Sequence, residues 1–187
     1  MPVYQDYDLP DALVSYCDKS NVALTIAAAD RDDVPLVYVN QAFLNLTGYS
    51  AEEVLGQNCR FLQAGAATEE ERSAMREFID DEDISAGRFR VTNSRANGET
   101  FQNFVFMTRL REPNGETRLF LGSQFDLTSA AERQNVKVDI AAHDESLLRN
   151  ADDLAAMSRG FGLAMIGSAK VLSESLSTMA TIIYREG

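Results

Sequence analysis

The reactive group that stands out in this 187-residue sequence is the thiol of Cys59, within the segment GQNCRFLQ at residues 56–63. The thiol lies between an amide, Asn58, and a guanidinium, Arg60, on what we expect to be a short helix. A lone cysteine is most often a buried, inert residue, and a cysteine nucleophile needs a base such as histidine beside it. The single histidine, His143, lies in the C-terminal region. These residues therefore do not favour an enzyme with a cysteine nucleophile.

The segment around Cys59 resembles the adduct-forming motif of the LOV family, the flavin-binding PAS domains that sense blue light. That motif usually has arginine where this chain has Gln57. Asn93, Asn103 and Gln124 resemble the amide residues with which the family binds the edge of the flavin ring. The resemblance implies that blue light drives a reversible bond between the sulfur of Cys59 and carbon C4a of the flavin. Such a reaction depends on proximity more than on a low thiol pKa.

The resemblance covers roughly Val22 to Thr128 and implies a flavin site of amides and apolar walls. One end of the flavin ring is apolar and its pyrimidine edge alternates donors and acceptors. Asparagine and glutamine offer both a donor and an acceptor without burying a charge. Asn58 belongs to the expected binding set, and the expected ring walls are Leu62, Val105, Met107, Leu121 and Gly122. For each of these wall residues alone, ordinary core packing is an equally good interpretation.

Two arginines, Arg60 and Arg76, are predicted to pair with a terminal phosphate, which favours FMN over riboflavin. Arg72 lies one helical turn before Arg76 and is an alternative phosphate partner. FAD is a further alternative if the phosphate end of the site opens to solvent. Gln63 is expected to hydrogen-bond the ribityl chain or the phosphate.

An antiparallel sheet would hold these side chains together. Hairpin-turn signals lie at residues 97–98 and 113–115, and the spacing of Thr68 and Glu71 is that of a capping box at the start of a helix. Strands are predicted at residues 22–28, 36–39, 88–94, 100–110 and 117–126. The expected fold class is α+β, a PAS/LOV fold with a five-stranded antiparallel sheet and flanking short helices.

An N-terminal helix is predicted before the first strand. Residues 9–20 have the apolar spacing of a short amphipathic helix. We therefore expect residues 1–21 to form a helical cap on a photosensor domain at residues 22–128.

A C-terminal helical extension is predicted at residues 129–187, which contain no proline. Apolar and small residues recur there at spacings of three and four from Leu147 to Ile182, as in helices packed side by side. This pattern favours an extension used for output and for a homodimer. Gly160 and Gly162 leave open whether the extension is one long helix or a helix hairpin.

The overall composition indicates which kinds of partner the protein is not expected to bind. A formal net charge of −12 and a pI near 4.5 disfavour binding to nucleic acid or to an anionic membrane surface. No apolar run is long enough to span a bilayer and the N-terminus has no signal-peptide pattern, so we expect a cytoplasmic location. The two cysteines lack metal-ligand spacing, which predicts free thiols and no metal site.

The expected function is blue-light sensing without catalysis on a substrate. Gln124 would turn its amide once flavin N5 becomes a donor, and the last strand would carry that change to the helices after Ser129. The result would be altered contacts within a homodimer or with an unidentified signalling protein. The sequence leaves three alternatives: a flavin-based redox sensor, a sensory fragment of a histidine-kinase system with His143 as phosphoacceptor, and a PAS domain used only for protein contacts.

Overall fold

The computed structural model describes residues 7–128 and 169–185. The expectations for His143, Gly160 and Gly162, and for most of the C-terminal extension, lie outside the described residues. Within these ranges no helix is both long enough and apolar enough to cross a membrane.

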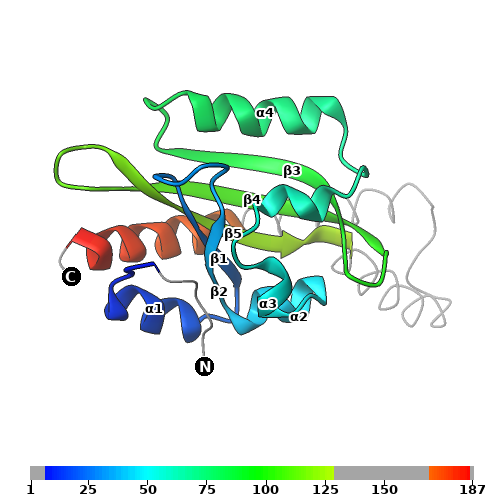
Figure 1. The fold of residues 1–187 in the computed structure, drawn as a ribbon, viewed down its shortest axis with the longest axis horizontal. Helices are drawn as coiled ribbons and strands as arrows, with labels where there is room; N and C mark the ends of the chain where they lie inside the picture. Colours follow the sequence, from blue (N-terminus) through cyan, green and yellow to red (C-terminus); the bar gives the residue numbers. More distant parts are fainter. Residues whose placement is uncertain (1–6, 129–168, 186–187) are drawn as a thin grey trace, which may run out of the picture.

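Five strands form one antiparallel sheet in the order β2-β1-β5-β4-β3 (Figure 1). Gly98 and Gly115 have φ values of 84° and 91° in the two predicted hairpin turns, a conformation that glycine adopts without steric cost. The strands are β1 (Ala23–Ala28), β2 (Leu36–Val39), β3 (Ala86–Ser94), β4 (Thr100–Arg111) and β5 (Thr117–Asp126). The predicted fold class and its five-stranded sheet are confirmed.

Four short helices connect β2 to β3: α2 (Gln41–Thr47), α3 (Ala51–Val54), the 3-10 helix η1 (Cys59–Gln63) and α4 (Glu69–Asp80). The predicted capping box begins α4, because the Thr68 hydroxyl accepts from the backbone N–H of Glu71 at 3.2 Å while the Glu71 carboxylate accepts from the backbone N–H of Thr68 at 2.8 Å. Cys59 is the first residue of η1, so the predicted short helix at the thiol is a single tight turn.

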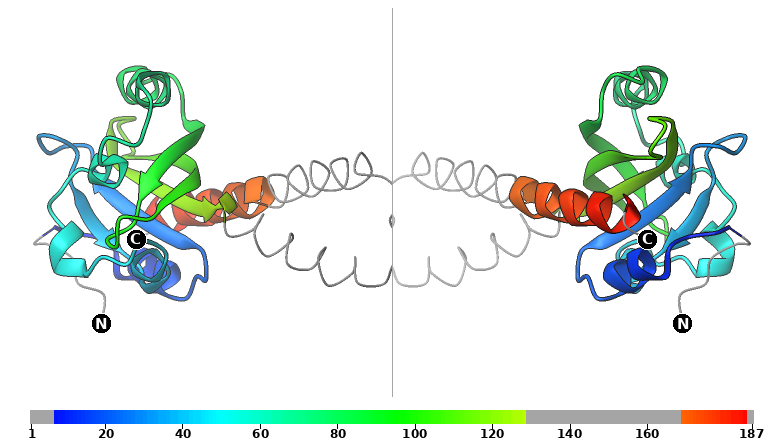
Figure 2. Two further views of the ribbon diagram at one scale, coloured as in Figure 1. Left: turned by 90° about the vertical axis from the view of Figure 1, so that its right-hand side faces the viewer. Right: turned by 90° about the vertical axis from the view of Figure 1, so that its left-hand side faces the viewer.

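Helices cover both faces of the sheet (Figure 2). Successive side chains of a strand point to opposite faces. On β5, Phe120 therefore packs with Phe78 of α4, whereas Leu121 packs with Leu13 of α1 (Asp11–Asp18). We call the side of α4 the inner face and the side of α1 the outer face. A helix at residues 169–185 also lies on the outer face, where Ala180 is fully buried.

Hydrogen bonds join both ends of the described chain to the outer face. The Tyr184 hydroxyl donates to the Glu112 carboxylate at 2.6 Å, and Arg118 donates to the same oxygen at 3.1 Å. Arg118 also donates from Nε to the Tyr7 hydroxyl at 3.2 Å. Through this network the segment before α1 and the end of the 169–185 helix share contacts on β5 and the β4–β5 turn.

Candidate functional site

A cavity of about 430 Å³ lies on the inner face, between the sheet and the helices η1 and α4. The sheet supplies its amides and part of its walls, η1 supplies the thiol, and α4 supplies arginines. The structure brings together around it the following predicted residues: Asn58, Cys59, Arg60, Gln63, Arg76, Asn93, Asn103, Val105, Met107, Gly122 and Gln124. One small chamber thus contains a thiol, several amides and several guanidinium groups.

One predicted wall residue, Leu121, needs correction. Leu121 packs on the outer face with Leu13 of α1, because its neighbours Gly122 and Gln124 line the cavity and a strand alternates its side chains. Leu121 therefore stabilises the outer side of the fold and does not wall the site. Leu62 is 1% exposed and packs with Phe43 and Val54 in a core cluster that also contains the cavity-lining Leu36, so its place in the ring wall stays a prediction.

The thiol of Cys59 is half-buried beside the cavity. Asn58 caps η1, since its side-chain oxygen accepts from the backbone N–H of Arg60 at 2.9 Å, and this fixes the turn that presents the thiol. Burial raises the pKa of Cys59 to about 12. The sulfur therefore remains a neutral thiol near neutral pH, unlike the thiolate of a catalytic cysteine.

The three predicted amides are buried and only partly hydrogen-bonded. Asn103 Nδ2 donates to Asn93 Oδ1 at 2.8 Å, and Gln124 Nε2 donates to Thr25 Oγ1 at 3.1 Å. Among the described residues, Asn103 Oδ1 and Gln124 Oε1 find no hydrogen-bond partner. A buried acceptor without a donor is destabilising. Unpartnered acceptors here fit a ligand that brings an N–H donor into the cavity, as N3–H on the pyrimidine edge of a flavin would.

Several apolar residues that line the cavity were not predicted from the sequence. Val91 and Phe120 could have been found, because Val91 pairs with Asn103 across β3 and β4 and Phe120 lies two residues before Gly122 on β5. The others come from the β1–β2 hairpin and α4, and only the tertiary fold brings them to the site: Ala27, Val34, Leu36, Met75 and Ile79.

Gly122 leaves space in the cavity because it has no side chain. A Cβ atom at this position would lie 2.7 Å from Thr25 Oγ1 and 3.3 Å from Gln124 Nε2. A larger residue would therefore displace the hydroxyl and the amide that hydrogen-bond each other beside it. The glycine preserves both the space and the polar contact at the amide end of the site.

Arginine side chains form the rim of the cavity. Arg60 pairs with Asp33, and Arg76 pairs with Glu69. Arg72, the alternative that the sequence offered, also lines the cavity and contacts Glu69 at 3.1 Å. Arg76 and then Arg72 hold the pKa of Glu69 below its usual range. The side chains of Arg60 and Arg76 are 57% and 60% exposed, so this rim opens to solvent.

The loop before β2 closes against the cysteine segment. Asp33 and Val34 have φ values of 67° and 48°, which are strained for residues other than glycine, above all for a β-branched one. Asn58 Nδ2 donates to the Asp33 carbonyl at 2.5 Å, and Arg60 contacts the Asp33 carboxylate. The residues on either side of Cys59 therefore hold the strained loop, and Val34 lines the cavity.

Comparisons with known proteins identify the family of the chain. A family model described as PAS domain matches residues 21–129. The chain is 34% identical over 173 residues to blue-light-activated histidine kinase 1 of Erythrobacter litoralis, which covers 87% of this chain and 47% of that protein. It is also similar to the solved LOV domain of the Erythrobacter litoralis EL346 blue-light activated histidine kinase, with 37% identity, a TM-score of 0.54 and coverage of 58% of this chain and 98% of that one.

Another similar structure is that of an RNA-binding light-oxygen-voltage receptor, with 35% identity, a TM-score of 0.60 and coverage of 76% of this chain and 42% of that one. Because that relative binds RNA, the expectation that this chain binds no nucleic acid stays a prediction. The chain spans less than half the length of the first curated relatives it matches.

Proposed function

Since the chain belongs to the LOV domains of the PAS family, we propose that it is a blue-light photoreceptor that binds FMN in the inner-face cavity and reacts with it through Cys59. The observation that carries the proposal is a neutral thiol and two unpartnered buried amide oxygens on one cavity. An enzyme nucleophile would need the opposite arrangement, an ionisable thiol with a base beside it.

The chemistry divides between the cofactor and the chain. When bound, the flavin would supply blue absorption, the ring carbon C4a that accepts a sulfur, and the ring nitrogen N5 that accepts the thiol proton. Cys59 supplies the sulfur and the proton. Asn93 and Asn103 would orient the pyrimidine edge, and Gln124 would hydrogen-bond N5 and turn its amide when that atom becomes a donor. The arginine rim would hold the phosphate of FMN.

The proposed output is a change in a homodimer or in contact with a signalling partner. Val171, Leu172, Met179 and Ile182 on the 169–185 helix are between 44% and 66% exposed. Apolar side chains at this spacing on one helix fit the seam expected from the sequence. Their exposure supports a second copy of the chain as the partner of this helix.

Absorption spectroscopy on the purified protein tests the proposal. The protein should be yellow, lose its structured blue absorption on illumination and regain it in darkness. Cys59→Ala should keep the colour and lose the reversible bleaching. Cys17→Ala is the matched control, because Cys17 is fully buried on the outer face and its loss should leave the cycle intact. A Cys59→Ala protein that still cycled would refute the role of this thiol.

A further inference from the structure

A buried arginine of β4, Arg109, closes the C-terminal end of α4. Its side chain is 5% exposed. It donates to four backbone carbonyls at and just beyond the end of the helix: Phe78 at 2.6 Å, Ile79 at 3.0 Å, Asp81 at 3.1 Å and Ile84 at 2.9 Å. The last carbonyls of an α-helix have no partner within the helix and lie at the negative end of its dipole. A cation from the sheet therefore satisfies the end of α4.

Two phenylalanine rings flank the same guanidinium. Its carbon lies 5.1 Å from the centre of the Phe78 ring and 4.9 Å from that of the Phe120 ring. Phe78 belongs to α4, and Phe120, on β5, lines the inner-face cavity. Such cation–π contacts are stronger when they are shielded from water. Arg109 does not itself line the cavity, yet it joins α4 to a strand that forms the cavity wall.

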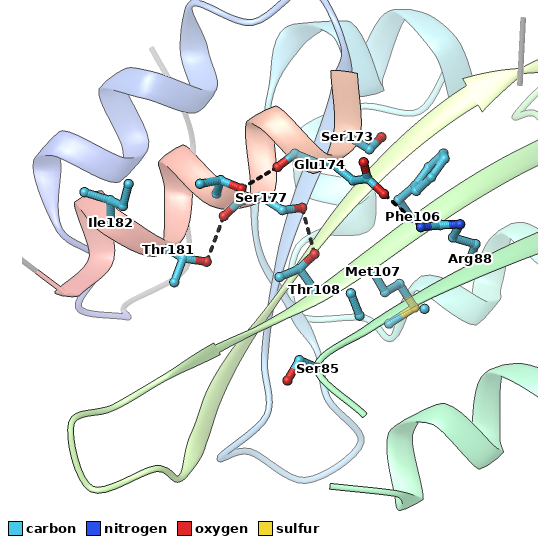
Figure 3. A pocket seen from close by; sticks show the side chains of 13 residues that line it. Ser85, Arg88, Phe106, Met107, Thr108, Ser173, Glu174, Ser177, Thr181 and Ile182 are labelled. Atoms are coloured by element: carbon cyan, nitrogen blue, oxygen red, sulfur yellow. Dashed lines mark hydrogen bonds and ion pairs between the residues drawn. The ribbon is translucent and has the colours of Figure 1, made fainter. Parts of the chain in front are cut away.

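The residue before Arg109 points to the other side of the sheet. The hydroxyl of Thr108 lies 2.7 Å from that of Ser177 on the 169–185 helix (Figure 3). On β5, the hydroxyls of Ser123 and Ser173 make a similar contact with this helix at 2.9 Å. Because a strand alternates its side chains, Arg109 faces the inner side, where α4 lies. A change at Arg109 therefore acts on α4 and leaves the contacts of the outer face in place.

The two ends of α4 are attached to the sheet unequally. Near the N-terminal end, the Thr92 hydroxyl of β3 donates to the Glu71 carboxylate at 3.1 Å. Arg76 pairs with Glu69 of the same helix, so this ion pair does not join the helix to the sheet. Near the C-terminal end, Phe78 is 3% exposed and adds its packing to the four hydrogen bonds of Arg109. The C-terminal end of α4 is therefore the firmly held end.

α4 forms one wall of the path between the rim and the amide end of the cavity. Asn103 and Gln124 are 1% and 4% exposed, whereas the side chain of Arg76, at the rim, is 60% exposed. Met75 and Ile79 of α4 line the cavity between these ends. A flavin ring that binds the amides would have to pass this wall to reach solvent. Its release therefore requires α4 to move away from the sheet.

We propose that Arg109 is a positioning residue that fixes the C-terminal end of α4 and thereby determines how long the flavin is retained. The flavin enters and leaves when the N-terminal end of the helix, at the rim, moves away from the sheet. This inference rests on the proposed binding of a flavin in the inner-face cavity. Because Arg109 acts on the wall and not on the phosphate, its loss should affect FMN and riboflavin equally.

The rate of flavin release in darkness tests the role of Arg109. It is measured as the exchange of bound FMN for an excess of isotope-labelled FMN. Arg109→Gln leaves buried carbonyls without a donor, so release should be about tenfold faster or more, by the same factor for FMN and riboflavin. Arg109→Lys keeps the charge but reaches fewer carbonyls, and its rate should lie between the two. Arg88→Gln is the matched control, because Arg88 pairs with Glu174 on the outer face (Figure 3).

Amide hydrogen exchange separates this role from general destabilisation. In Arg109→Gln, exchange at residues 78–81 should be faster while residues 23–28 of β1 keep their protection. If Arg109→Gln does not fold, Arg109→Lys gives the same comparison with a smaller effect. Normal release in both variants would overturn the inference, as would an equal loss of protection across the whole sheet. An unmodified protein that binds no flavin would instead refute the proposed function.

A variant at the other end of α4 tests which end moves. Thr92→Val removes the hydroxyl that donates to Glu71 and keeps a side chain of similar shape. Release of FMN should be several-fold faster, while residues 78–81 keep the exchange protection that they have in the unmodified protein. An unchanged release rate in Thr92→Val would overturn opening at the N-terminal end.

Discussion

Cys59 differs from a catalytic cysteine in what surrounds its sulfur. Its neighbours Asn58 and Arg60 do not activate it: Asn58 caps η1 and binds the loop before β2, and Arg60 pairs with Asp33. Burial is the cause of its raised pKa, of about 12. The reactivity of Cys59 would therefore depend on its proximity to the flavin proposed to occupy the cavity, and not on ionisation of the thiol.

The pH dependence follows from that pKa. Because the folded pKa of Cys59 is about 12, the thiol stays protonated from about pH 6 to about pH 9, and the amplitude of reversible bleaching should be constant over this range. Spectra recorded at each pH after identical illumination would check this. An amplitude that rose through pH 8 would instead indicate a reactive thiolate.

The raised thiol pKa values also predict how the free energy of unfolding depends on pH. Cys17 also has a pKa raised to about 12, first by its burial and then by the charge of Asp18. Both folded pKa values exceed the ordinary value of 9.0, so the thiols ionise at a lower pH in the unfolded chain than in the folded protein. The contribution of the two neutral thiols to the free energy of unfolding is therefore fully present below about pH 9 and is lost as the pH rises towards 12. The urea midpoint of unfolding should fall above about pH 9, and Cys17→Ala should reduce that fall. A midpoint independent of pH in this range would contradict it.

The rim arginines should select between flavins. Arg76→Gln removes one charge from the proposed phosphate site, and because its side chain is 60% exposed we expect a loss of about 1 kcal/mol, or about fivefold, in FMN affinity. Riboflavin, which lacks the phosphate, should bind the variant as before. Fluorescence titration of the flavin-free protein with each flavin would measure the ratio. An equal loss for both flavins would show that Arg76 acts through the fold alone.

At the scale of the element, β5 connects the two faces of the molecule. Its inner side carries Gly122 and Gln124, and its outer side carries Leu121 and Ser123. One strand thus contributes to the cofactor cavity and to helix docking at adjacent residues. The function proposed for the chain depends on this alternation as well as on the thiol of Cys59.

A methyl group on this strand should empty the cavity without unfolding the protein. In Gly122→Ala the added Cβ would lie 2.7 Å from Thr25 Oγ1, which must shift together with the Gln124 amide. We expect flavin occupancy, measured as the ratio of blue to ultraviolet absorbance, to fall several-fold while the circular dichroism spectrum is retained. Gly115→Ala provides a contrast, because no atom lies within 4 Å of its Cβ position, although its positive φ adds backbone strain. A fully occupied Gly122→Ala protein would refute the steric argument.

Sequence alone predicted the parts that depend on local pattern. The strand segments, the turns at Gly98 and Gly115 and the capping box at Thr68 all depend on a few neighbouring residues, and the structure has each of them. Leu121 was assigned to the wrong face although Gly122 beside it was assigned correctly, and strict alternation would have excluded one of the two.

Contacts between segments far apart in the chain could not be predicted from the sequence. Val34 reaches the cavity through a strained loop, and Asp33 and Glu69 pair with the rim arginines from segments whose approach no local pattern specifies. The packing of the 169–185 helix across the sheet, including the Ser123–Ser173 contact, was equally unpredictable, because two serines fifty residues apart carry no signal of proximity.

At the scale of the whole molecule, α4, which borders the cavity, and the terminal helices lie on opposite faces of one sheet (Figure 2). The N-terminal segment and the 169–185 helix both hydrogen-bond to the Arg118–Glu112 pair. Movement of one of them would therefore change the hydrogen bonds of the other. The exposed apolar residues of the helix are the surface through which such movement would reach a second copy of the chain.

Illumination should change the mass of the assembly. Light scattering in darkness and in light would measure the proposed homodimer, and Leu172→Glu, at a residue 51% exposed, should shift the protein to monomer without altering bleaching. Because each chain carries a net charge of −12, added salt should strengthen association by screening repulsion between copies. A single unchanged mass in darkness, in light and in Leu172→Glu would exclude this helix as the dimer contact.

The open arginine rim has a further consequence for the origin of the colour. The ring end of the cavity is enclosed by buried amides, while the side chains of Arg60 and Arg76 are more than half exposed. Flavins that differ only beyond the phosphate would share the same ring environment, so FMN and FAD should give the same visible spectrum and the same thiol reactivity. A group attached beyond the phosphate of the proposed flavin would therefore extend into solvent at this rim and leave the wavelength unchanged, while the enclosed ring end would discriminate against flavins with enlarged rings.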